Sequence, residues 1–170
     1  MLPLRCAHGQ HDRPASCSQS VRICVHRCAS VVSTLLMRVI AGEARGVPLV
    51  APAGRGTRPT SDRTKEAIFS VLGDLGCEGR VLDLFAGSGA LGIEALSRGA
   101  TFCDFVDSAA AACRAIEANL AKTKLAAQGR VHRQPVARFV AAATGRAAGV
   151  SYDLILMDPP YELLELDALL

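Results

Sequence analysis

From residue 37 onward, short apolar runs alternate with segments whose apolar residues recur at helical spacing. The runs are typical of strands buried on both faces, and they lie at residues 80–85, 101–106, 129–133 and 152–157. Strands that alternate with helices predict a doubly wound, mostly parallel α/β sheet. Ligands of such sheets bind at the carboxyl ends of the strands, so functional residues are expected there.

The segment ahead of the first strand predicts a hairpin and a helix. Residues 38–41 and 47–51 are expected to pair as a small hairpin. Thr60 or Ser61 is expected to cap a helix that ends at Leu72. The expected buried face of this helix consists of Ala67, Ile68, Val71 and Leu72.

Three further helices are expected between the strands. A glycine-rich turn opens the first, which ends at Gly99. Ser108 is expected to cap the second, whose buried face carries Ala109, Cys113, Ile116 and Leu120. Pro135 lies in the first turn of the third, which bears Val136, Phe139 and Val140.

Residues 1–36 differ from the rest of the chain in composition. They hold four of the seven cysteines, three of the four histidines and the whole net charge of +3. Since they show no periodicity, we expect a non-native or disordered extension, with the domain beginning at Met37 after a misassigned start. An organelle transit peptide is the alternative, because the segment is rich in Arg and poor in acidic residues. The spacing of Cys24, His26 and Cys28 departs from that of zinc sites, so no metal is expected.

Composition bounds the class of protein. The chain has 170 residues, half of them hydrophobic and 21% charged, and no apolar run approaches the roughly 20 residues of a membrane span. These values favour one globular domain and exclude membrane-spanning and disordered classes. Cys77, Cys103 and Cys113 lie in apolar surroundings typical of reduced core cysteines, so a reducing compartment such as the cytoplasm is expected.

The segment from Asp83 to Gly92 follows the first predicted strand and carries the most prominent glycine pattern. Its glycines match G-x-G-x-x-G, which indicates a dinucleotide site or simply a tight turn. Asp83 would face a pyrophosphate unfavourably, but it suits a ligand with positive charge such as S-adenosylmethionine, which has an ammonium and a sulfonium. Asp107, at the end of the next strand, is suited to accept hydrogen bonds from the two hydroxyls of an adenosine ribose, or to cap a helix.

The segment Asp158-Pro-Pro-Tyr161 follows the last predicted strand. An exocyclic amine of a nucleobase is a poor nucleophile, so its methylation needs acceptors that draw its N–H groups. Asp158 and the carbonyl of Pro159 are such acceptors, Pro160 removes a competing donor, and Tyr161 offers a ring for stacking a flipped base. An ordinary turn after a strand is the alternative.

Residues 38–66 carry six basic groups against three acidic ones. A basic loop and hairpin suit contact with a phosphate backbone, and a solvated helix face with internal ion pairs is the alternative. The candidate RNA-binding residues are Arg38, Arg45, Arg55, Arg58 and Arg63.

Together these segments resemble one family, the RsmD-type bacterial 16S rRNA guanine-N2 methyltransferases. The resemblance rests on residues 38–42, 58–69, 82–99 and 158–161. It implies a Rossmann-like class I methyltransferase fold, S-adenosylmethionine as methyl donor, and transfer to the 2-amino group of a guanine in 16S rRNA while the small subunit assembles. It also implies a cytoplasmic protein that is monomeric when full length.

The resemblance also implies roles for particular residues. Asp158, Pro159, Pro160 and Tyr161 would hold the target base, and Asp107 the ribose. The remaining cofactor-binding residues would be Asp83, Phe85, Ala86, Gly87, Ser88, Gly89 and Thr60. The chain departs from the family at Gln134-Pro135-Val136, where an Asp-Ala-like pair usually contacts the adenine.

Only 12 residues follow Asp158, whereas the class I sheet adds further strands there. We therefore expect a C-terminally truncated domain over residues 37–170, with an unpaired edge on its last strand, marginal stability and a tendency to aggregate. Three other functions stay open: a DNA or other N-methyltransferase, a catalytically inactive RNA-binding fragment, and an NAD-binding oxidoreductase.

Overall fold

The centre of the molecule is a five-stranded sheet in the order β1-β5-β2-β3-β4. The computed structural model describes residues 22–25, 37–53, 62–73, 79–145 and 150–159. Every pair of neighbouring strands in it is parallel. The strands are β1 (Arg22–Val25), β2 (Gly79–Leu84), β3 (Ala100–Asp107), β4 (Gly129–Arg133) and β5 (Leu154–Met157).

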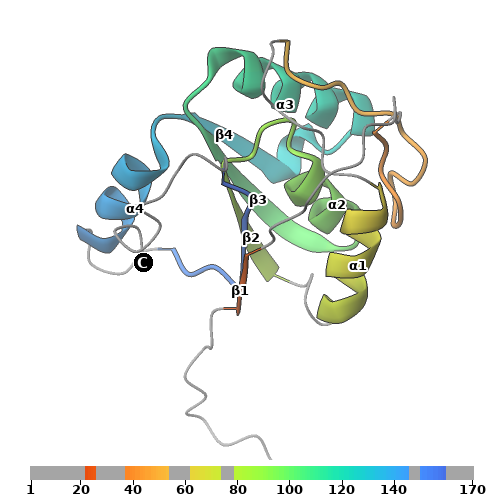
Figure 1. Cartoon of the computed structure of the whole chain (residues 1–170), viewed down its shortest axis with the longest axis horizontal. Helices are drawn as coiled ribbons and strands as arrows, with labels where there is room; N and C mark the ends of the chain where they lie inside the picture. The colour runs from red at the N-terminus through yellow and green to blue at the C-terminus, as the bar shows by residue number, and fades with distance from the viewer. Residues whose placement is uncertain (1–21, 26–36, 54–61, 74–78, 146–149, 160–170) are drawn as a thin grey trace, which may run out of the picture.

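Helices cover both faces of this sheet (Figure 1). Those in the described part of the chain are α1 (Asp62–Leu72), α2 (Ala90–Ser97), α3 (Ala110–Thr123) and α4 (Val136–Gly145), with a short 3-10 turn η2 (Ala126–Gln128) after α3. The α/β prediction is therefore confirmed, including the exact bounds of β4. Neighbouring parallel strands must be joined by a crossover connection, which is usually a helix, and this explains why strands and helices alternate in the sequence.

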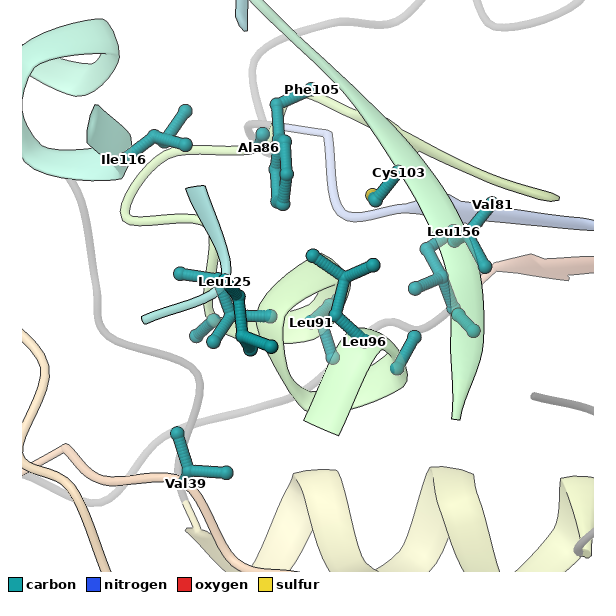
Figure 2. Packing of buried hydrophobic residues seen from close by; sticks show 14 of the residues in the cluster. Val39, Val81, Ala86, Leu91, Leu96, Cys103, Phe105, Ile116, Leu125 and Leu156 are labelled. Carbon is teal, nitrogen blue, oxygen red and sulfur yellow. The ribbon is translucent and has the colours of Figure 1, made fainter. Parts of the chain in front are cut away.

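The two faces of the sheet bury different sets of residues, because side chains alternate along each strand. On the larger face Val81, Cys103 and Phe105 pack against α1, α2 and α3. Figure 2 shows Phe105 between Ile116 of α3 and Leu91 of α2, with Val39 farther out. On the other face Leu82, Leu84, Val106 and Met157 pack against Val136 of α4.

Strand β5 has a partner on each side. It pairs with β2 and, on the edge away from β2, with β1 in the register Arg22↔Leu154 to Val25↔Met157. The expectation of an unpaired edge on this strand is therefore wrong, and residues 22–25 form a strand within the segment expected to be a non-native or disordered extension. The sequence Arg-Ile-Cys-Val is short and rich in β-branched residues, a weak signal within a segment otherwise without periodicity.

Residues 37–53 form a minimal version of the expected hairpin, with hydrogen bonds from the Val39 amide to the Val47 carbonyl at 3.0 Å and from the Leu49 amide to the Met37 carbonyl at 2.7 Å. Their one isolated bridge joins Arg38 and Pro48 in antiparallel fashion. Proline at 48 cannot donate to a strand ladder, which keeps the pairing short, and side chains of α2 and α3 bind further backbone amides of this segment.

Helix α1 buries a different face from the one expected. Ile68 is buried as expected, but Ala67 is exposed and 87% of Val71 is exposed. The buried positions of this helix are Thr64, Lys65, Ile68 and Phe69. The expected face was wrong because it was chosen from apolar residues alone, whereas Lys65 lies in the core beside a carboxylate of α2.

Candidate active site

The glycine turn joins β2 to α2 over residues 85–89. Its backbone is left-handed at Phe85, Gly87 and Gly89, with φ of 58°, 56° and 76°. Two hydrogen bonds fix it, from the Ala86 amide to the Val106 carbonyl at 3.1 Å and from the Gly89 amide to the Ala86 carbonyl at 2.7 Å. Glycine is needed at 87 and 89 because other residues rarely adopt this conformation, whereas Phe85 adopts it at a cost.

The third glycine of the motif has another purpose. A Cβ at Gly92 would lie 2.4 Å from Phe105 Cε1 and 2.7 Å from Cys103 Sγ. Glycine here lets α2 lie directly on β3, which brings the amino end of α2 to the carboxyl end of β2.

Asp83 lies at the core of the site with only 2% of its surface exposed. Its Oδ2 accepts a hydrogen bond from the Gly92 amide at 2.9 Å. The pKa of Asp83 is raised to about 7, mainly by burial and also by the negative charges of Asp158 and Asp107, while the Gly92 hydrogen bond acts to lower it. Three carboxylates thus act on one another around the glycine turn, and a cation bound among them would relieve their repulsion.

Asp107 connects the glycine turn to the next helix. Its Oδ2 accepts a hydrogen bond from the Gly87 amide at 2.9 Å, and its Oδ1 accepts one from the Ala109 amide at 2.8 Å. The N-cap of α3 is Ala109, without a side-chain cap of its own. The expectation that Ser108 caps this helix is therefore wrong, because Asp107 already satisfies the free amide. Its carboxylate keeps further lone pairs on both oxygens.

Asp158 and Pro159 follow β5 directly, at the edge where Met157 pairs with Leu84 of β2. Asp158 is exposed and Pro159 is half-buried. The carboxyl ends of β2, β3 and β5 thus bring Asp83, Asp107 and Asp158 to one edge of the sheet, as the parallel topology predicts. Pro160 and Tyr161 lie outside the described residues.

The candidate RNA-binding residues, and Thr60 of the candidate cofactor site, are only partly described. Arg38, Arg45 and Arg63 are exposed, and Arg38 Nε donates to Asp62 Oδ2 at 3.1 Å. Outside the described residues lie Arg55, Arg58 and Thr60. The structure therefore brings together the carboxylates and the glycine turn, and it leaves the roles of the arginines as expectations.

A buried ionic cluster that the sequence did not predict connects helix α2, which follows the glycine turn, to residues 37–53. Glu94 of α2 accepts hydrogen bonds from the amides of Ile40 at 2.8 Å and Ala41 at 3.0 Å. Lys65 Nζ lies 3.7 Å from Glu94 Oε2 and donates to the carbonyl of Arg38. Burial lowers the pKa of Lys65, opposed by Glu94 and Asp62. The signal in the sequence was a glutamate inside an otherwise apolar helix, because a residue of that kind is fully buried only when paired.

A second polar cluster lies on the face covered by α4. Asp104 Oδ2 accepts hydrogen bonds from Arg80 Nη2 at 2.7 Å and from the Tyr152 hydroxyl at 3.0 Å, and its Oδ1 lies 2.7 Å from His132 Nε2. Burial raises the pKa of Asp104, but these partners outweigh burial and hold it below its ordinary value. His132 also packs edge-on against Phe139 of α4. Since Asp83 packs on the opposite face, His132 is no acid or base for chemistry at the glycine turn.

Two features are absent from the described residues, a cluster of metal ligands and a membrane-spanning helix. Among them, no group of three or more His, Cys, Asp or Glu side chains is arranged to hold a metal ion. No helix within the described segments has the length and apolar character needed to cross a membrane. Cys103 and Cys113 are buried free thiols, as expected for core cysteines.

Comparison with known proteins decides the family. A family model described as "Conserved hypothetical protein 95" matches residues 37–169. The chain is 47% identical over 134 residues to the Bacillus subtilis protein "Putative rRNA methyltransferase YlbH". This match covers 79% of this chain and 72% of that protein. The chain belongs to the RsmD-type methyltransferase family. Another relative in this RsmD-type family is the Escherichia coli protein "Ribosomal RNA small subunit methyltransferase D", 37% identical over 125 residues.

Solved structures agree with the RsmD-type assignment. The Escherichia coli protein "Putative methyltransferase yhhF" superposes with a TM-score of 0.65 at 35% identity, over 78% of this chain and 70% of that one. A hypothetical protein of Thermus thermophilus gives a TM-score of 0.65 at 34% identity, over 76% of this chain and 72% of that one. The match to the Escherichia coli methyltransferase D covers 74% of this chain and 60% of that protein, so the chain spans less than two thirds of its length. The Rossmann-like fold of class I methyltransferases is thereby confirmed.

Proposed function

We propose that this chain transfers a methyl group from S-adenosylmethionine to the 2-amino group of a guanine in the rRNA of an assembling small ribosomal subunit. The observation that carries the proposal is the group of three carboxylates around a glycine turn in a chain of the RsmD-type family. The proposed domain is residues 37–170, whose start coincides with the start of the family match, and residues 1–36 are proposed as an extension to it.

The residues present fit S-adenosylmethionine. This cofactor supplies a methyl group activated by a sulfonium, and it also carries an ammonium. Asp83 would meet the positive charge of the methionine end, which returns its pKa toward the ordinary value. Asp107 would accept hydrogen bonds from the ribose hydroxyls through the lone pairs that Gly87 and Ala109 leave available. The turn of residues 85–89, with Thr60, would line the remainder of this site.

Asp158 would position the target amine. Its exposed carboxylate lies at the same sheet edge as the glycine turn, and it would accept an N–H of the guanine amine while the Pro159 carbonyl accepts the other. Pro160 and Tyr161 would continue this contact to the base. Asp158 would also take up the amine proton that methylation releases and pass it to water. Exposed Arg38, Arg45 and Arg63, with Arg55 and Arg58, would contact RNA phosphates.

Methyl transfer to small-subunit particles that lack the modification tests the proposal. Asp158→Ala is expected to lower the rate at least about 100-fold, because the amine loses its acceptor. Asp153→Ala is the matched control, because Asp153 is also an exposed aspartate next to β5. It lies at the opposite end of the strand, where its carboxylate accepts a hydrogen bond from the Arg80 amide. Full activity of Asp158→Ala, or equal loss in both variants, would overturn the assignment.

A second candidate is an inactive RNA-binding fragment, which the exposed arginines Arg38, Arg45 and Arg63 favour. Calorimetry separates the candidates. Micromolar binding of S-adenosylhomocysteine with methyl transfer supports the enzyme, and RNA binding without either supports the fragment. Binding of NAD in place of S-adenosylhomocysteine would indicate an oxidoreductase and refute both. Transfer to DNA or another amine instead of rRNA would refute only the substrate.

A further inference from the structure

Residues 37–53, here called the strap, take their shape from other parts of the molecule. Within the strap the backbone forms a turn and one isolated bridge. Several of its other amides donate to groups outside the strap, on Glu94 and Ser97 of α2 and on Asn119 of α3. In Figure 1 the strap runs beside α1, α2 and α3. Two of the exposed arginines proposed to contact RNA, Arg38 and Arg45, belong to it.

Asn119 is the residue at which the strap and the glycine turn meet. Its side chain is fully buried. Its Oδ1 accepts the Val50 amide at 2.7 Å, and its Nδ2 donates to the Val50 carbonyl at 2.9 Å and to the Ser88 carbonyl at 2.9 Å. Both Nδ2 hydrogens are therefore used, one on each segment.

These bonds make the two segments depend on each other. If the strap shifts, Asn119 loses both bonds to Val50, and nothing then fixes its orientation toward Ser88. If the turn shifts, the buried Nδ2 loses a partner that it cannot replace from solvent, which is costly for a buried donor. A direct contact supports this link, because Ser88 Oγ lies 3.4 Å from Met37 Sδ at the other end of the strap.

We infer that Asn119 is a positioning residue that couples the strap to the glycine turn, so that cofactor affinity and the ordering of the RNA-facing strap change together. The inference rests on the proposed function for the identity of the two ligands. Coupling between binding sites is reciprocal, so RNA is expected to tighten cofactor binding by the same factor by which cofactor tightens RNA binding. A factor of about 5 to 20 is expected, within the range typical of coupled sites.

The test compares Asn119→Leu, which removes all three bonds with little change in size, with Thr123→Val on the same helix. Thr123 is also buried, and its hydroxyl donates to the Asn119 and Leu120 carbonyls within α3 without touching either segment. Both variants lose buried hydrogen bonds and some stability. Asn119→Ala and Thr123→Ala form a second pair in case the isosteric variants do not fold.

Amide hydrogen exchange is measured at Leu49 and Val50 in the strap and at Gly87 and Gly89 in the turn, with and without S-adenosylhomocysteine. In the unmodified chain and in Thr123→Val, the ligand is expected to slow exchange in the strap about 5-fold or more. In the Asn119 variants this protection is lost, and the RNA concentration for half-maximal rate no longer falls as cofactor is raised. Retained protection in the Asn119 variants would overturn the inference.

Failure of the proposed function gives a different result. If the unmodified chain does not bind S-adenosylhomocysteine, the cofactor assignment is wrong. The coupling is then still tested without ligand, because the Asn119 variants are expected to speed exchange in the strap and in the turn together. Faster exchange in only one segment, or the same pattern in the Thr123 variants, would contradict the coupling itself.

Discussion

Replacing Asp83 with Asn tests the electrostatic character of the proposed cofactor site. The change removes one buried charge and keeps the shape of the side chain. Asn also keeps an oxygen to accept the Gly92 amide, which lies 2.9 Å from Asp83 Oδ2 in the unmodified protein. In the folded protein without ligand, the pKa of Asp83 is raised from 3.8 to about 7, mainly by burial. Between these two values the folded state holds a proton that the unfolded state has lost.

The sign and size of the effect follow from this difference. The contribution of Asp83 to the free energy of unfolding is greatest below about pH 4, where its carboxyl is protonated in both states. This contribution falls as pH rises and is lost above about pH 7. At about 1.4 kcal/mol for each pH unit, ionising this carboxyl in the folded state costs up to about 4 kcal/mol. Asn carries no such cost, so Asp83→Asn is expected to be more stable than the unmodified chain at pH 8.

Urea unfolding of both proteins at several pH values between 4 and 8 measures the effect. The difference in unfolding free energy is expected to grow with pH and to level off above about pH 7. Titrating groups far from Asp83 behave equally in both proteins, so they cancel in the difference. Calorimetry at pH 8 is expected to show at least about 10-fold weaker binding of S-adenosylhomocysteine to the variant, because its ammonium loses a carboxylate.

A difference in unfolding free energy that stays constant with pH would refute this reasoning. It would mean that Asp83 ionises in the folded protein as readily as in water, with the amide of Gly92 and the amino end of α2 offsetting its burial. Unchanged ligand affinity in Asp83→Asn would separately remove Asp83 from the cofactor site.

Three further substitutions test close packing, backbone strain and a hydrogen bond. Gly92→Ala places a Cβ 2.4 Å from Phe105 Cε1, so the free energy of unfolding in urea is expected to fall by about 2 kcal/mol. In Gly87→Ala the nearest atom is 3.9 Å away, so only backbone strain at φ of 56° acts, and a fall of about 1 kcal/mol is expected. Equal losses would contradict the close-packing role of Gly92. Tyr152→Phe removes the hydrogen bond to Asp104 at 3.0 Å, with an expected loss of about 1 kcal/mol and unchanged affinity for S-adenosylhomocysteine. A changed affinity would show that the two faces of the sheet communicate.

Much of the sheet could be predicted because its strands are continuous apolar runs separated by clear helical spacing. The residues 129–133 were expected as a strand, and β4 has those bounds. The carboxylates of the site could also be predicted, since parallel topology places the ends of β2, β3 and β5 together. A local pattern was enough in these cases because each side chain is positioned by its own strand.

The remainder depends on contacts between distant segments. Lys65 is buried only because Glu94, 29 positions later, meets it on another helix, and a single lysine gives no sign of such a partner. The strap pairs with itself over only a few residues, and Glu94 and Asn119 bind the amides of Ile40 and Val50 beyond that pairing, which no local pattern predicts. Asp107 replaces Ser108 as helix cap because its carboxylate reaches Ala109 while also binding the glycine turn.

The pairing of β1 with β5 has a consequence for the order of folding. Arg22 lies beside Leu154, so the first described strand to be synthesised finds its partner only after the last described strand has left the ribosome. Contacts between such distant segments raise contact order, which slows folding. Until then the edge of β1 is open to other chains, and nascent chains waiting in this state are the ones that a chaperone would recognise.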